Sequence, residues 1–170
     1  MSISIQYRGS MANTAEVETL MEEAEDIANI MRWPCEIWDE DWNRPPDVHF
    51  ESIRGGGIQI VGHSALRGIS LQPHPLCEPL LLLFRPDGSM SSPFQLALDA
   101  GEGYPQKQLW LSTETYSAGY LAHAAIVRLL QHLKKRYLHN LEIRDATGFA
   151  DSGDETRLQA FFHALSAVSG

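Results

Sequence analysis

Apolar and polar residues alternate over residues 3–7, where Ile3, Ile5 and Tyr7 are separated by polar neighbours. A period of two predicts a β-strand with one buried face. Over residues 14–32 the apolar positions recur three and four residues apart, which predicts an amphipathic α-helix. A short strand is predicted next, at residues 35–39. The first part of the chain therefore predicts a strand–helix–strand unit.

The same order of elements is predicted again after residue 107. A strand at residues 108–112 precedes a helix with a broad apolar surface over residues 117–137, and a strand at 141–145 follows. Shifting the chain by 106 positions places residues 3–39 on residues 109–145 without a gap, and buried positions then coincide although only four of 37 residues are identical. This pattern indicates a possible internal duplication. The alternative is that two unrelated units share loop lengths, since such connections are commonly short.

The segment between these units, residues 43–106, is rich in glycine and proline. Short apolar runs within it predict strands near residues 57–61, 68–71, 80–84 and 94–98, and a last helix is predicted at residues 154–168. We therefore expect an α+β fold: two split βαβ halves in a ferredoxin-like arrangement, residues 3–39 and 109–145, with residues 43–106 as a β-rich insertion and a C-terminal helix. The length suits one domain, residues 1–170.

Charge is distributed unevenly over a chain whose formal net charge is −9. The first half, residues 3–39, holds eight acidic and two basic residues, whereas residues 109–145 hold three acidic and five basic ones. The overall acidity argues against a nucleic-acid partner, which requires a cationic surface. The chain starts without a secretory signal pattern and holds no apolar run of about 20 residues, so we expect a cytoplasmic protein that does not enter a membrane.

An acidic segment bracketed by two tryptophans follows the first helix. It consists of Trp38, Asp39, Glu40, Asp41 and Trp42. Aromatic anchors dominate interface energetics, and complementary charge speeds encounter, so this segment is a candidate for binding a basic protein partner. The alternative interpretation is a solvated acidic turn whose tryptophans pack in the core, because Trp is usually largely buried.

A second group of polar residues is expected around the second helix. His123 falls where the first half has Val17, so a titratable group stands at a position that a hydrophobic side chain would fill. The expected topology places it near Glu114, Tyr116 and Asp145, and a buried histidine beside a carboxylate is able to act as a general base or metal ligand. A hydrogen-bonded core histidine is the alternative. Asp151 and Asp154 belong to the same end but also suit a helix start.

No complete catalytic or metal-binding motif is present in the sequence. The spacing of His49, His63, His74 and Cys77 matches no zinc pattern, and two cysteines, Cys35 and Cys77, favour reduced thiols over a disulfide framework. We therefore expect no metal and no cofactor. The leading hypothesis is a non-catalytic interaction module with an acidic N-terminal face. The rivals are a small enzyme or ligand-binding domain using the His123 end, and a homodimer in which the acidic first helix meets the basic second helix of another copy.

Overall fold

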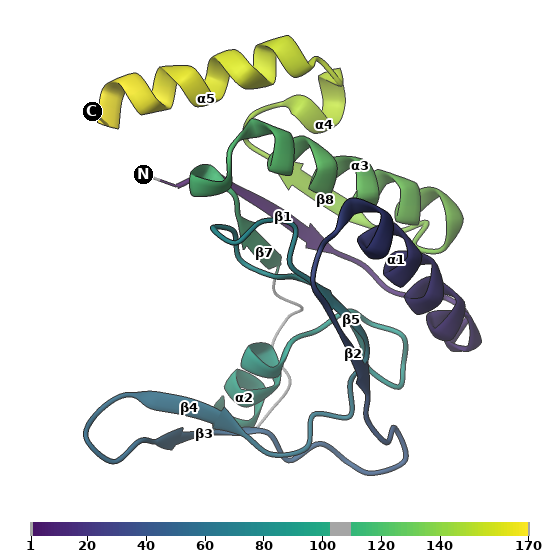
Figure 1. Cartoon of the computed structure of the whole chain (residues 1–170). Coiled ribbons are helices and arrows are strands. Elements are labelled where there is room, and N and C mark those ends of the chain that lie inside the picture. Colours follow the sequence, from purple (N-terminus) through teal and green to yellow (C-terminus); the bar gives the residue numbers. More distant parts are fainter. Residues whose placement is uncertain (1, 103–109, 170) are drawn as a thin grey trace.

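The computed structural model describes residues 2–102 and 110–169, and this part of the chain forms three small antiparallel sheets and five α-helices (Figure 1). The predicted α+β class is confirmed. No helix among the described residues is long and apolar enough to cross a membrane. Two 3₁₀ turns are also present: Thr14–Glu16 precedes the helix α1 (Val17–Met31), and Tyr116–Ala118 precedes the helix α3 (Tyr120–Arg136).

The first sheet has β1 (Ser4–Arg8) at its centre, between β7 (Leu111–Glu114) and β8 (Glu142–Asp145). Both neighbours run antiparallel to β1 and hence parallel to each other. The helix α3 (Tyr120–Arg136) connects them. The second predicted strand–helix–strand unit is therefore present as a split βαβ unit with β1 inserted between its strands. Its first strand was predicted at residues 108–112, of which 108 and 109 lie outside the described residues, and β7 begins at Leu111.

The first unit pairs differently, and the predicted ferredoxin-like arrangement is not shown by the strand order. After α1 (Val17–Met31), the strand β2 (Cys35–Asp39) joins a second sheet of order β2-β5-β6. Both edges of β1 are occupied by β7 and β8. At the last residue of β7 the backbone bonds to the segment just before β6, because Glu78 N donates to Glu114 O over 3.3 Å.

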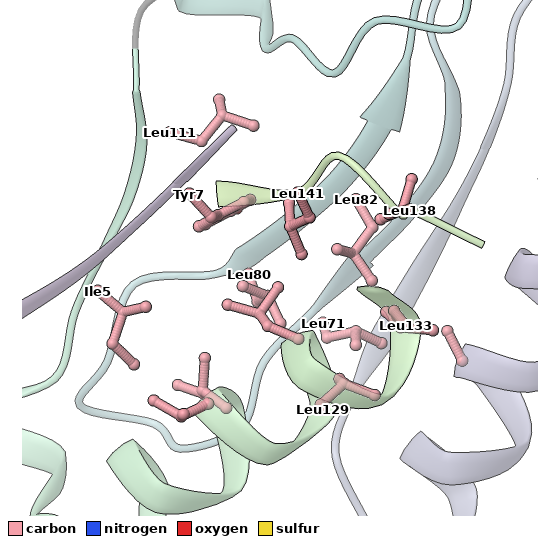
Figure 2. Close-up of a cluster of buried hydrophobic side chains, with 14 of the residues drawn as sticks. Ile5, Tyr7, Leu71, Leu80, Leu82, Leu111, Leu129, Leu133, Leu138 and Leu141 are labelled. Atoms are coloured by element: carbon pink, nitrogen blue, oxygen red, sulfur yellow. The ribbon is translucent and has the colours of Figure 1, made fainter. Parts of the chain in front are cut away.

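The second sheet consists of β2, β5 (Arg67–Leu71) and β6 (Leu80–Phe84), and it carries cores on both faces. Successive strand residues point to opposite faces. Leu82 accordingly joins the main core with α1, α3 and the first sheet, while Leu83 joins a smaller core. Figure 2 shows the main cluster, in which side chains from both sheets converge on α3. The predicted strands at 68–71 and 80–84 are thus confirmed.

A hairpin and a short helix stand against the smaller core. The hairpin pairs β3 (His49–Ser52) with β4 (Ile58–Val61). Its turn holds Gly55, Gly56 and Gly57, all at φ near +100°, a conformation that side chains disfavour. In Figure 1 the hairpin and α2 (Pro93–Glu102) extend away from the remaining elements.

Residues 94–98, predicted as a strand, lie in α2, so that prediction was wrong. Pro93 is the first helical residue, where its missing N–H costs nothing. The Ser92 hydroxyl accepts a hydrogen bond from Gln95 N over 3.2 Å, as a helix cap does. Leu96 and Ala97 then pack in the smaller core. A short apolar run is compatible with a strand or a helix, and here the cap at Ser92 favours the helix.

The chain ends in two helices, α4 (Phe149–Ser152) and α5 (Glu155–Ser169). The predicted C-terminal helix is confirmed. Asp154 caps it, because its carboxylate accepts a hydrogen bond from Arg157 N over 3.2 Å. The buried residues Leu158 and Phe162 fix α5 to the main core.

Candidate functional site

The structure brings His123, in the first turn of α3, together with Asp145 at the end of β8. His123 Nε2 lies 3.0 Å from Asp145 Oδ1, and Nδ1 lies 2.8 Å from the Thr115 hydroxyl. Both side chains of the His–Asp pair are 0% exposed. The Phe162 ring of α5 stands edge-on to the imidazole, with 5.6 Å between ring centroids. The two side chains are therefore shut off from solvent, although Asp145 also belongs to the lining of a neighbouring hollow.

Both carboxylate oxygens of Asp145 face at least one donor. Oδ1 accepts from Thr147 N and from the Thr147 hydroxyl as well as facing His123, and Oδ2 accepts from Ala150 N over 3.1 Å. Burial alone raises the pKa of this carboxyl, but the hydrogen bonds from His123 and Thr147 outweigh burial and lower the pKa to about 2. The ionised carboxylate thus links α3, β8 and the start of α4. In this setting the pair acts as a structural clamp.

The other residues predicted for this end lie near the pair but do different things. Glu114 Oε1 accepts hydrogen bonds from Ile3 N and Tyr116 N, so it closes the loop after β7. Tyr116 packs against the main core. Among the residues that the structure describes, neither side chain hydrogen-bonds to His123. Asp151 is exposed, and Asp154 is the cap of α5.

A hollow of about 640 Å³ lies beside this end of the first sheet. Ser4 and Gln6 of β1 line it together with Arg144 of β8, Asp151 and Phe161. The Arg144 guanidinium lies 4.1 Å from the centroid of the Trp110 ring. The sequence did not predict a site at Arg144 and Trp110. These residues are far apart in the chain, and the pairing of β7 and β8 with β1 brings them together.

The acidic segment Trp38–Trp42 is largely engaged within the chain. Asp39 forms an ion pair with Arg67 at 2.8 Å. Glu40 accepts hydrogen bonds from Ser64 N and the Ser64 hydroxyl, and its Oε2 lies 3.1 Å from His63 Nδ1. Asp41 Oδ1 accepts from Asn43 N. These bonds satisfy the carboxylates at the turn where β2 ends.

Its two tryptophans are half-buried. Trp42 Nε1 donates to Phe84 O over 3.2 Å, and Trp38 packs against the smaller core. Trp38 Nε1 is buried without a hydrogen-bond partner among residues 2–102 and 110–169. Partner binding by Trp38, Asp39, Glu40, Asp41 and Trp42 stays a prediction.

Unpaired carboxylates gather instead on the outer side of α1. Glu18, Glu22 and Glu25 follow at spacings of four and three, which places them on one side of the helix. They line a hollow of about 200 Å³ together with Met21 of α1 and residues of the second sheet, Ile37, Asp39 and Arg67. None of the three forms an ion pair within the described part of the chain. The helical spacing was visible in the sequence, but the absence of partners was not. We call Glu18, Glu22, Glu25, Ile37 and Asp39 the acidic face.

The next carboxylate of α1, Glu23, is neutralised by α3. It lies 2.8 Å from His132 Nε2 and 3.4 Å from Arg136 Nε, and it accepts from the Tyr137 hydroxyl. Burial raises the pKa of Glu23, and the hydrogen bonds from Tyr137 and His132 with the charge of Arg136 lower it by more. The acidic first helix and the basic second helix, whose meeting between two copies was one of the rival hypotheses, thus contact each other within one chain.

No group of three or more histidine, cysteine or acidic side chains in residues 2–102 and 110–169 has metal-binding geometry. Comparison with protein-family models, curated proteins and solved structures found no significant match to this chain.

Proposed function

We propose that this protein is a non-catalytic interaction module that binds a basic protein partner through its acidic face. The observation that carries this proposal is a set of three neighbouring carboxylates, Glu18, Glu22 and Glu25, that form no ion pair within the described residues. They line a hollow in which the cation, Arg67, is paired with Asp39. Glu23 and Asp145, by contrast, are paired within the chain.

Charge and apolar surface complement each other at this face. Three like charges on one side of a helix repel each other, and a cationic partner relieves that repulsion. Ile37, which is 44% exposed, offers apolar contact next to the charges, and the buried Met21 also lines the hollow. Because the carboxylates lie at the surface, we expect binding that is fast and sensitive to salt.

The test is capture of basic partners by the intact protein at increasing salt, with matched charge variants. Glu22→Gln with Glu25→Gln removes two charges of the face, and Glu51→Gln with Glu155→Gln removes two charges elsewhere. We expect the first variant to weaken binding about fivefold to thirtyfold, since each exposed charge contact contributes about 0.5–1 kcal/mol. Equal affinity of the two variants for the partner contradicts the proposal.

The acidic segment Trp38–Trp42 contributes to this proposal mainly through Asp39, which belongs to the acidic face. Replacing Glu40 and Asp41 with Gln and Asn tests the wider mapping. Binding that is unchanged after this replacement restricts the partner site to α1 and β2. A homodimer through this face is disfavoured, because two copies would bring like charges together.

A second candidate function is binding of a small anionic ligand in the 640 Å³ hollow, which supports the ligand-binding alternative at the His123 end. The favouring observation is Arg144, whose guanidinium forms no ion pair among the described residues and lies over Trp110. Arginine recognises carboxylates and phosphates. A thermal-shift screen of small carboxylates and phosphates is the test: stabilisation that is lost in Arg144→Gln supports the candidate, and no stabilisation by any of them sinks it.

A further inference from the structure

The strand β2 is an edge of its sheet. Its neighbour is β5, and within residues 2–102 and 110–169 the strand order β2-β5-β6 leaves its other side without a strand. Four of its five residues are exposed, and Trp38 is half-buried. A strand edge presents unpaired N–H and C=O groups that are able to pair with another chain.

The residues whose backbone groups face outward follow from the bonds at the two ends of β2. Gln72 N donates to Pro34 O, and Glu40 N donates to Leu66 O. In a trans peptide the N–H points opposite to the C=O, so Cys35 N–H and Asp39 C=O point away from β5. Antiparallel ladders alternate, and Ile37 therefore also directs its N–H and C=O to the open edge.

The side chains of these residues lie on the side of the sheet that α1 covers. Ile37 and Asp39 line the same hollow as Glu18, Glu22 and Glu25. A strand added along β2 would carry every second side chain toward these carboxylates.

We propose that an extended basic segment of the partner pairs with the free edge of β2 as a fourth strand, with alternate lysine or arginine side chains directed to the acidic face. This inference rests on the proposed function and adds the conformation and register of the partner. Main-chain hydrogen bonds supply affinity in such strand addition, and the alternate side chains supply specificity. A second copy of this chain is the wrong occupant, because acidic side chains beside an edge oppose self-pairing.

The probe is an eight-residue peptide of alternating lysine and threonine, used with the intact protein, and a glutamate–threonine peptide is the control. Two further lysine–threonine peptides are methylated on backbone nitrogens. The first carries a methyl group on the backbone nitrogen of every lysine, and the second on that of every threonine. In an added strand one set of N–H groups faces β2 and the other faces solvent. We expect one methylated peptide to lose binding and the other to keep it.

Amide hydrogen exchange locates the added strand without a substitution. At a peptide concentration about ten times Kd, exchange of the Cys35 and Ile37 amides should slow about tenfold, because only the free protein exchanges. The amides of Glu36 and Trp38, which face β5, serve as internal controls that change less.

The outcomes separate the two proposals. Binding of both methylated peptides, with unchanged exchange at Cys35 and Ile37, overturns strand addition and leaves the acidic face as the partner site. Binding of the glutamate–threonine peptide as tightly as the lysine–threonine peptide, or no binding of the lysine–threonine peptide, overturns both. Self-association through β2 without peptide would overturn the assignment of a basic occupant.

Discussion

Two carboxylate-rich regions of this molecule have opposite surroundings. Beside the N-terminal part of α3, the Asp145 side chain is 0% exposed and meets a donor at each carboxylate oxygen. On α1, Glu18 and Glu22 are exposed and form no ion pair within the described residues. A buried, fully bonded carboxylate stabilises the fold, whereas an exposed and unpaired cluster is available to a partner. His123 and Asp145 therefore hold elements of the fold together, while those two exposed carboxylates of α1 have no such bonds within the described residues.

The largest expected effect is the loss of the Asp145 clamp. Asp145→Ala leaves His123 and the amides of Thr147 and Ala150 buried without their acceptor, and we expect it to lower the free energy of unfolding by about 3–5 kcal/mol. Urea unfolding measures this. Asp151→Ala, at an exposed position nearby, is the matched control, and a similar small loss in both variants would break the comparison.

Acid should weaken the same clamp. The pKa of Asp145 is about 2 in the fold against an ordinary 3.8, so its ionisation stabilises the protein above pH of about 4. That contribution, about 2 kcal/mol, is lost as the pH falls from about 4 to about 2. Stability measured against pH should fall less steeply in Asp145→Asn than in the original protein. Parallel curves would contradict the role of this carboxylate.

Within the acidic segment Trp38–Trp42, we expect one carboxylate to stabilise the fold as Asp145 does and another to contribute little. Glu40, with its bonds to Ser64 and His63, resembles Asp145, and Glu40→Ala should cost about 1–3 kcal/mol of unfolding free energy. Asp39 forms one surface pair with Arg67, so Asp39→Ala should cost about 0–1 kcal/mol. Thermal unfolding of the two variants gives the order, and a reversed order would show that the bonds to Glu40 matter less than its position indicates.

The smallest expected effect on stability is at the acidic face itself. Glu22→Gln with Glu25→Gln should change the free energy of unfolding by less than about 0.5 kcal/mol, because neither side chain has an ionic partner to lose. Chemical unfolding at low salt checks this. A loss of more than about 2 kcal/mol would place these carboxylates with Asp145 as structural groups.

The helices α1, α3 and α5 and most strands were predictable because their periodicity is local, whereas α2 was predicted as a strand and α4 was not predicted. The strand at residues 35–39 was predicted, but its partner was not, since pairing depends on which edges other strands occupy. The strand–helix–strand order predicted that His123 lies near Asp145. It did not predict the contact between His123 and the Thr115 hydroxyl. Neighbouring Glu22 and Glu23 look alike in the sequence. Their environments differ because α3, 109 positions along the chain, provides His132 for Glu23.

The central claim is that the unpaired carboxylates of α1, rather than the His123 end, form the partner site. The most direct measurement is a titration of isotope-labelled protein with the lysine–threonine peptide, followed by amide chemical shifts. The account predicts the largest shifts at Glu18–Glu25 and Cys35–Asp39, reduced by salt and by Glu22→Gln with Glu25→Gln. Shifts concentrated around Arg144, His123 and Asp151, or insensitive to that variant, would contradict it.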